Sequence, residues 1–212
     1  MSAKRLAFLL LSVFVASGIA QVNQLSLTVG RTFIGTQSLQ NDPTSLYPRV
    51  HFGDETSFAF NYARLLKSRG MFGLSAELPV AVAPRIDLNT YLNQIPKDIG
   101  VLFVTPSVRV NFFHEQSITP WASVGAGWTR WRQSKDLNYF DNSSAPTSVN
   151  TYAIQFGAGL DVWPWHRWGI RTEFRDFYSG TPDLNANPSL PAITGRSRQH
   201  NFYLGIGAIH RF

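Results

Sequence analysis

Apolar side chains recur at every second position along most of the chain after Gln24. The clearest stretch is residues 72–82, in which the side chains between the apolar ones are small or charged. The apolar positions are Phe72, Leu74, Ala76, Leu78, Val80 and Val82. Successive side chains of a strand point to opposite faces. The pattern therefore predicts a strand with one wholly apolar face.

The same alternation predicts eight strands in all. They cover residues 25–33, 58–62, 72–82, 102–112, 118–128, 152–162, 168–178 and 202–212. Short turns at 67–70, 114–117 and 164–167 alternate with long polar loops at roughly 37–50, 84–99, 132–150 and 179–199. This arrangement is typical of an all-β, eight-stranded antiparallel up-and-down transmembrane β-barrel with short periplasmic turns and long extracellular loops.

A soluble β-sandwich also alternates, because its apolar faces cover a common core. Two observations favour the barrel. The faces opposite the apolar ones carry charged residues beside many Gly, Ser and Thr, while the whole chain holds only four Lys. Aromatic residues also bracket the apolar faces, as expected at the two membrane interfaces. They are Tyr62, Phe72, Phe112, Trp168 and Phe212 at the lower rim, and Trp128, Tyr152, Tyr178 and Phe202 at the upper rim.

The N-terminus reads as a secretory signal peptide over residues 1–20, followed by the barrel domain over residues 21–212. A basic start at Lys4 and Arg5 precedes the apolar run 6–16 and the small residues of Gly18-Ile19-Ala20. The apolar run is too short for a membrane anchor helix. Removing Lys4 and Arg5 lowers the formal charge from +6 to +4. The remaining basic residues are dispersed, so no nucleic-acid partner is expected.

Several segments resemble a known family. They are Thr105–Phe113, Thr119–Gly127, Phe156–Asp161 and Gly169–Asp176. They are similar to the small outer-membrane β-barrel domain family, the eight-stranded barrels of the OmpA, OmpX and OmpW type. The resemblance covers nearly all of the mature chain and implies a location in the outer membrane of a diderm bacterium. The terminal Phe212 resembles the insertion signal that the barrel-insertion machinery reads, although His210 stands where Tyr is more usual.

The inward-facing charges are the main candidate site. Glu77, Arg109, Asp161, Arg171, Glu173 and Arg175 have inward parity. A buried charge without a partner is costly, so we expect a lumen ion-pair network that fills the barrel. A gated proton or ion path is the alternative. The inward pairs Gly125/Gly127, Gly157/Gly159 and Gly205/Gly207 open no helix after a strand, so they are not nucleotide loops. We expect them to leave room for large side chains on the opposite wall.

No catalytic, cofactor-binding or metal-binding residue is predicted. His51 and His200 fall near upper strand ends with Asp54, Ser57 and Ser197 nearby in sequence, but no recognisable lipase motif accompanies them. The five His lack metal-ligand spacing. The absence of Cys excludes disulfides and thiolate metal sites.

The predicted function is an integral outer-membrane barrel with a filled polar lumen and a structural or surface-interaction role. Expected partners are outer-membrane lipid, lipopolysaccharide and the barrel-insertion machinery, and a monomer is expected. A filled lumen argues against a general diffusion porin, because open channels need about 16 strands. A narrow channel or small-molecule transporter, a lipid-modifying enzyme, and an adhesin acting through loops near 132–150 and 179–199 stay as alternatives.

Overall fold

The computed structural model describes residues 22–35, 37–38, 49–89, 98–133, 148–180 and 198–212. The predicted signal peptide lies outside these residues. Within them the chain forms eleven strands: β1 (Asn23–Ile34), β2 (Gln37–Ser38), β3 (Arg49–Phe52), β4 (Glu55–Arg69), β5 (Phe72–Asn89), β6 (Asp98–Val104), β7 (Ser107–Phe112), β8 (Ile118–Gln133), β9 (Ser148–Val162), β10 (Trp168–Gly180) and β11 (Arg198–Arg211). No helix in the described part is long and apolar enough to cross a membrane.

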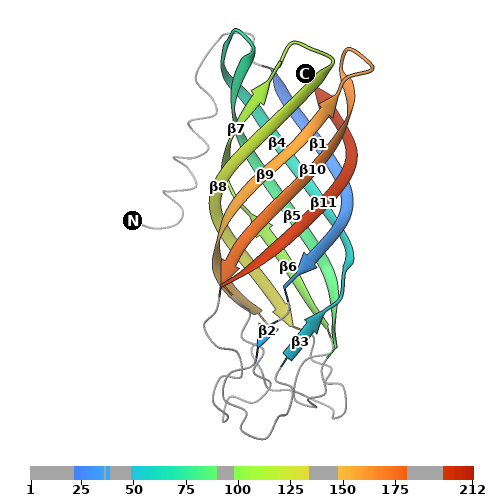
Figure 1. Ribbon diagram of the computed structural model, residues 1–212, viewed down its shortest axis with the longest axis vertical. Coiled ribbons are helices and arrows are strands. Elements are labelled where there is room, and N and C mark those ends of the chain that lie inside the picture. Colours follow the sequence, from blue (N-terminus) through green and yellow to red (C-terminus); the bar gives the residue numbers. More distant parts are fainter. Residues whose placement is uncertain (1–21, 36, 39–48, 90–97, 134–147, 181–197) are drawn as a thin grey trace, which may run out of the picture.

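Nine of these strands close into a ring of eight wall elements, while β2 and β3 pair with each other beside the loop end of β5 (Figure 1). Going round the ring, the order is β1, β4, β5, β6 with β7, β8, β9, β10 and β11, and every pair is antiparallel. The β6 and β7 strands count as one wall element, because β5 and β8 pair with both of them. The predicted eight-stranded up-and-down barrel is confirmed.

The first and last strands form the seam that closes the barrel. They pair from Gln24↔Arg211 to Ile34↔Asn201. The backbone groups of Asn23 and Phe212 continue this ladder with two mutual hydrogen bonds of 3.0 Å. Closure leaves no free edge in the ring of wall strands, which is the condition for strands to cross lipid.

The two ends of the barrel differ in their connections. At the turn end, short connections at 70–71, 113–117 and 163–167 join successive strands, and Gly70 adopts the left-handed conformation with a φ of 56°. The C-terminus also lies at this end (Figure 1). At the loop end, the sequence between neighbouring wall strands is longer, at 35–54, 90–97, 134–147 and 181–197. By the rule for such barrels, the turn end is periplasmic and the loop end extracellular.

One predicted loop is shorter than expected, because a β-bulge prolongs β5. Ala83 pairs with Val101 and Ile86 pairs with Ile99, so Pro84 and Arg85 both lie opposite Gly100. A bulge accepts proline, which has no N–H to give to the ladder. The strands therefore continue to Asn89 and resume at Asp98, well inside the loop predicted over 84–99.

The outer surface of the ring is apolar. Neighbouring side chains such as Leu27, Leu204 and Ile206 are each more than half exposed. The predicted rim aromatics Phe72, Trp168 and Phe212 are exposed at the turn end, and Trp128, Tyr152 and Phe202 are exposed at the loop end. A closed barrel with an exposed apolar belt between two aromatic rims is suited to a bilayer and not to water.

Candidate functional site

The six predicted lumen charges form one buried group, which we call the ionic layer: Glu77 on β5, Arg109 on β7, Asp161 on β9, and Arg171, Glu173 and Arg175 on β10. All six are at most 3% exposed. Three cations face three carboxylates, so the layer is formally neutral. Formal neutrality lowers the cost of keeping charges inside a membrane-embedded barrel.

The first pair joins adjacent strands. Arg171 and Asp161 are register partners on β10 and β9. The guanidinium donates from Nε to Oδ1 at 2.7 Å and from Nη2 to Oδ2 at 2.6 Å. This two-bond fork is among the strongest geometries available to a charged pair.

The second pair crosses the lumen. Arg175 Nη2 lies 2.5 Å from Glu77 Oε1, although β10 and β5 stand on opposite sides of the ring of eight. Arg175 Nε also contacts Glu173 Oε2 at 2.8 Å. Asn61 donates from Nδ2 to the same Glu77 oxygen, and Thr28 donates to Glu173 Oε1 at 2.5 Å. The two walls are therefore tied together through the centre of the barrel.

Trp121 on β8 lies among the three arginines. The guanidinium carbons of Arg109, Arg171 and Arg175 are 5.6, 5.1 and 5.1 Å from its ring centre, within cation–π range. Its indole Nε1 donates to Asp161 Oδ1 at 3.2 Å.

Gly159 provides the room for that ring. A Cβ added at Gly159 would lie 2.5 Å from Trp121 Cζ2. Gly159 is the register partner of Trp121 on the adjacent strand, so the room comes from a neighbouring strand and not from the opposite wall as expected.

Arg109 differs from the other two arginines. It donates to Gln24 Oε1, and no carboxylate of the described residues forms an ion pair with it. Its Nε and Nη1 have no hydrogen-bond partner among those residues. Its positive charge is stabilised by the cation–π contact with Trp121 and by the three carboxylates of the ionic layer.

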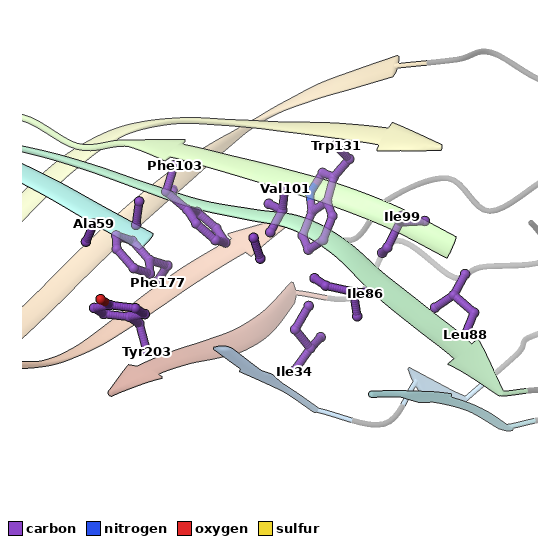
Figure 2. Packing of buried hydrophobic residues seen from close by; sticks show 13 residues of the cluster. Ile34, Ala59, Ile86, Leu88, Ile99, Val101, Phe103, Trp131, Phe177 and Tyr203 are labelled. Atoms are coloured by element: carbon purple, nitrogen blue, oxygen red, sulfur yellow. The ribbon is translucent and has the colours of Figure 1, made fainter. Parts of the chain in front are cut away.

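The interior of the loop-end half contains an apolar cluster that was not predicted, beside buried polar side chains such as Thr129, Ser179 and Asn201. Figure 2 shows the apolar cluster, in which inward side chains from all around the ring meet. Its members are Ile34, Ala59, Ala81, Ala83, Ile86, Leu88, Ile99, Val101, Phe103, Trp131, Ala153, Phe177 and Tyr203. Phe103 stacks on Phe177 with ring centres 4.3 Å apart, and it meets Trp131 edge to face at 6.2 Å.

The predicted polar lumen is therefore incomplete, because it leaves out the apolar cluster. A signal for this cluster was present in the sequence. Phe103 has the parity of Arg109, and Phe177 has the parity of Arg171 and Arg175. Continuing the same alternation of inward positions along each strand towards the loop end predicts that both aromatic side chains face inwards. Ile86 is hidden from this rule, because the bulge shifts the inward positions of β5 from odd to even numbers.

The two regions meet at Tyr203. Its ring belongs to the apolar cluster, and its hydroxyl lies 2.8 Å from Thr28 Oγ1. Thr28 in turn donates to Glu173 of the ionic layer. A single fully buried side chain thus has an apolar body in one region and a polar tip in the other, which is a common use of tyrosine.

The residues weighed as enzyme candidates lie on different faces of the wall. Ser57 is fully buried inside, where it accepts a hydrogen bond from Thr32 Oγ1 at 2.7 Å. His200 is outside with its Nδ1 2.7 Å from Asp176 Oδ2, and Asp54 is outside against Arg31 at 2.5 Å. Ser197 and the side chain of His51 lie outside the described residues. Among the described residues, no cluster of three or more His, Asp and Glu side chains is suited to hold a metal.

The predicted insertion signal lies on the exterior of the seam. Phe212 is 60% exposed, and its ring stacks against His210 with ring centres 5.8 Å apart. His210 also contacts Trp168 at 4.5 Å. The terminal aromatic is therefore part of the turn-end rim.

No family model and no curated protein matches the chain. Solved structures do match it. The outer membrane protein OprG from Pseudomonas aeruginosa is 11% identical over 91% of this chain and 95% of its own, with a TM-score of 0.57. The outer membrane protein AlkL in lipid bilayers is 14% identical over 93% of each chain, with a TM-score of 0.51. The chain has the fold of a small outer-membrane β-barrel. With its exposed apolar belt, this outer-membrane barrel fold indicates an integral protein of a bacterial outer membrane, as predicted.

Proposed function

We propose that this protein is a closed outer-membrane barrel that does not conduct solutes and whose role is structural or is performed by its outer surface. The observation that carries the proposal is the Arg175–Glu77 pair across the lumen. This pair fills the interior together with Arg171, Asp161 and Trp121, and each of these side chains is at most 3% exposed. A solute crossing this level has to separate buried, paired charges.

The cost of that separation supports closure. Breaking a buried ion pair by removing one partner costs about 3–5 kcal/mol, because the other charge is left without compensation. An eight-stranded ring also has an interior only wide enough to be filled by its own side chains. A structural or surface role is therefore favoured over bulk transport.

Conductance in planar lipid bilayers tests the proposal. We expect no steady conductance from the mature protein. The paired substitution Glu77→Ala with Arg175→Ala keeps the net charge while removing the contact across the lumen, and it is expected to introduce openings. The matched control is Arg31→Ala with Asp54→Ala, which removes an exterior ion pair of the same kind. A steady conductance in the unsubstituted protein would contradict the proposal.

The apolar cluster favours a second candidate, a transporter of small apolar molecules that enter from the loop end. Such a role requires an apolar ligand to compete with the packing of Phe103, Trp131 and Phe177. Equilibrium binding of an apolar fluorescent dye distinguishes the two candidates. Saturable binding that Ile99→Asp abolishes would favour the transporter, whereas no saturable binding favours the closed barrel.

A further inference from the structure

A groove marks the exterior of the barrel near the loop end. It has a volume of about 710 Å³, and its lining includes Val82, Pro84, Gly100, Leu102, Arg130 and Arg132. The bulge of β5 creates the groove together with Gly100, which faces the bulge without a side chain. A Cβ at Gly100 would lie 2.8 Å from the carbonyl oxygen of Pro84, so this close approach requires glycine.

One edge of the groove is basic. Arg130 and Arg132 are exposed on the outward face of β8, about 7 Å apart along the strand. Among the described residues, no carboxylate forms an ion pair with either of them. Other outward arginines near the loop end are paired, since Arg31 contacts Asp54 at 2.5 Å and Arg85 contacts Asp87 at 3.3 Å. Within the described part of the chain, the charge at this edge is therefore not neutralised by an ion pair.

The position of the groove specifies its surroundings. Trp128 precedes Arg130 by two residues on the same outward face and pairs with Tyr152 on β9. Exposed aromatics of this kind mark the boundary between hydrocarbon and head groups. The apolar floor then borders the acyl chains, and the two guanidinium groups reach the head groups beyond, as long basic side chains do at interfaces.

We propose that this groove binds a phosphorylated glycolipid of the outer leaflet, the lipid A part of lipopolysaccharide. An acyl chain would lie over Val82, Pro84 and Leu102, and a phosphate would sit between Arg130 and Arg132. Guanidinium groups bind phosphate oxygens with two parallel hydrogen bonds, which makes a pair of arginines a better phosphate site than a pair of lysines. Ser148, which pairs with Arg132 in the ladder, adds a hydroxyl at the same edge.

Glycolipid is favoured over glycerophospholipid because the site faces the outer end of the barrel and offers two cations beside one groove. A head group with more than one phosphate on a sugar scaffold can contact both. The inference is independent of whether the lumen conducts, because every residue that carries it is on the exterior.

The test measures retention of lipid A by the folded mature protein in detergent, using native mass spectrometry during a lipid A titration. Arg130→Ser with Arg132→Ser is expected to weaken binding about 30-fold, taking a typical contribution for each basic residue near an anionic membrane surface. Arg31→Ser is the matched control, since it removes one rim arginine that is already paired, and it is expected to leave retention unchanged. Heat-modifiable gel mobility checks that every variant folds.

Further variants and lipids make the result specific. Arg130→Lys with Arg132→Lys keeps the charge and is expected to recover only part of the affinity. Dephosphorylated lipid A and phosphatidylglycerol are both expected to bind more weakly than lipid A. Equal retention by the double Ser variant overturns the proposal, as does equal binding of dephosphorylated lipid A. Equal, arginine-dependent binding of phosphatidylglycerol overturns the choice of a glycolipid.

Discussion

The ionic layer and the apolar cluster fill the same barrel in opposite ways. Both consist of inward side chains that are almost completely buried. The apolar cluster draws on strands from all around the ring, whereas the ionic layer draws on β5, β7, β9 and β10. In the ionic layer the contacts are directed, as in the fork between Arg171 and Asp161. In the apolar cluster they are contacts between surfaces, as in the stacked rings of Phe103 and Phe177.

The two regions place different requirements on their side chains. Any set of side chains of the right volume fills an eight-stranded lumen, so packing alone does not select charges. A charge inside the ring requires a specific partner, whereas an apolar ring accepts several neighbours. The ionic layer therefore ties particular strands together, and Arg175 with Glu77 does so across the centre. The apolar cluster supplies burial that is less dependent on individual partners.

The largest expected effect comes from leaving charges unpaired in the ionic layer. Arg175→Met removes the partner of both Glu77 and Glu173 while keeping an apolar stem of similar length. We expect a loss of about 4 kcal/mol in the free energy of unfolding. Denaturant titration in lipid vesicles, followed by tryptophan fluorescence, measures it.

The control restores the neutrality of the ionic layer. Adding Glu77→Gln to Arg175→Met leaves two cations and two carboxylates in the layer, so much of the lost stability is expected to return. A loss below about 1 kcal/mol for Arg175→Met alone would mean that water replaces the guanidinium, and the directed contacts would then not be what stabilises this half.

A cavity in the apolar cluster is expected to cost somewhat less. Ile99 is fully buried, and Ile99→Ala should lower the free energy of unfolding by about 3 kcal/mol, compared with about 1 kcal/mol for Ile99→Val. The same denaturant titration applies. If the two regions are energetically separate, Ile99→Ala and Arg175→Met add within about 0.5 kcal/mol. A larger deviation would indicate coupling, with Tyr203 as the physical link between the regions.

The sequence predicts the strands and the direction of most side chains, but not every position. Period-two alternation predicts eight strands and the correct face for Leu204 and for Arg171, because a strand has only two faces. It fails at the β5 bulge, where Pro84 and Arg85 together lie opposite Gly100. Continued past the bulge, the alternation assigns Ile86 and Leu88 to the outer face, although both are buried inside.

Pairing within the ionic layer depends on strand register and on the geometry of the closed ring, which the alternation does not give. Arg171 and Asp161 become partners through the register of adjacent strands, which turn lengths help to set. The Arg175–Glu77 contact depends on the diameter and stagger of the closed ring, and these are properties of all eight strands together. No local pattern around either residue contains them.

A smaller effect is expected from the aromatic centre of the ionic layer. Trp121→Phe keeps a ring near the three arginines but removes the indole N–H that donates to Asp161. Since Arg171 still satisfies that carboxylate, we expect a loss of about 2 kcal/mol in the free energy of unfolding. The matched Trp131→Phe substitution removes an N–H that has no partner among the described residues, and it should cost less. Equal losses would mean that ring volume, and not the hydrogen bond, determines the cost at both sites.

The smallest effect on the free energy of unfolding is expected for an ion pair on the exterior of the barrel. Arg31 and Asp54 are as close as Arg175 and Glu77, at 2.5 Å, but their side chains are 63% and 53% exposed. Exposed pairs gain little, because water and salt screen the charges and two long side chains lose rotamer freedom. A double-mutant cycle on Arg31→Ala and Asp54→Ala should give a coupling energy below about 1 kcal/mol that falls further in high salt. The same cycle on Arg175 and Glu77 should give a larger value that salt hardly changes, because solvent ions do not reach the pair. If the exterior pair proved as strong as the interior one, the contact distance rather than burial would determine the strength of an ion pair in this barrel.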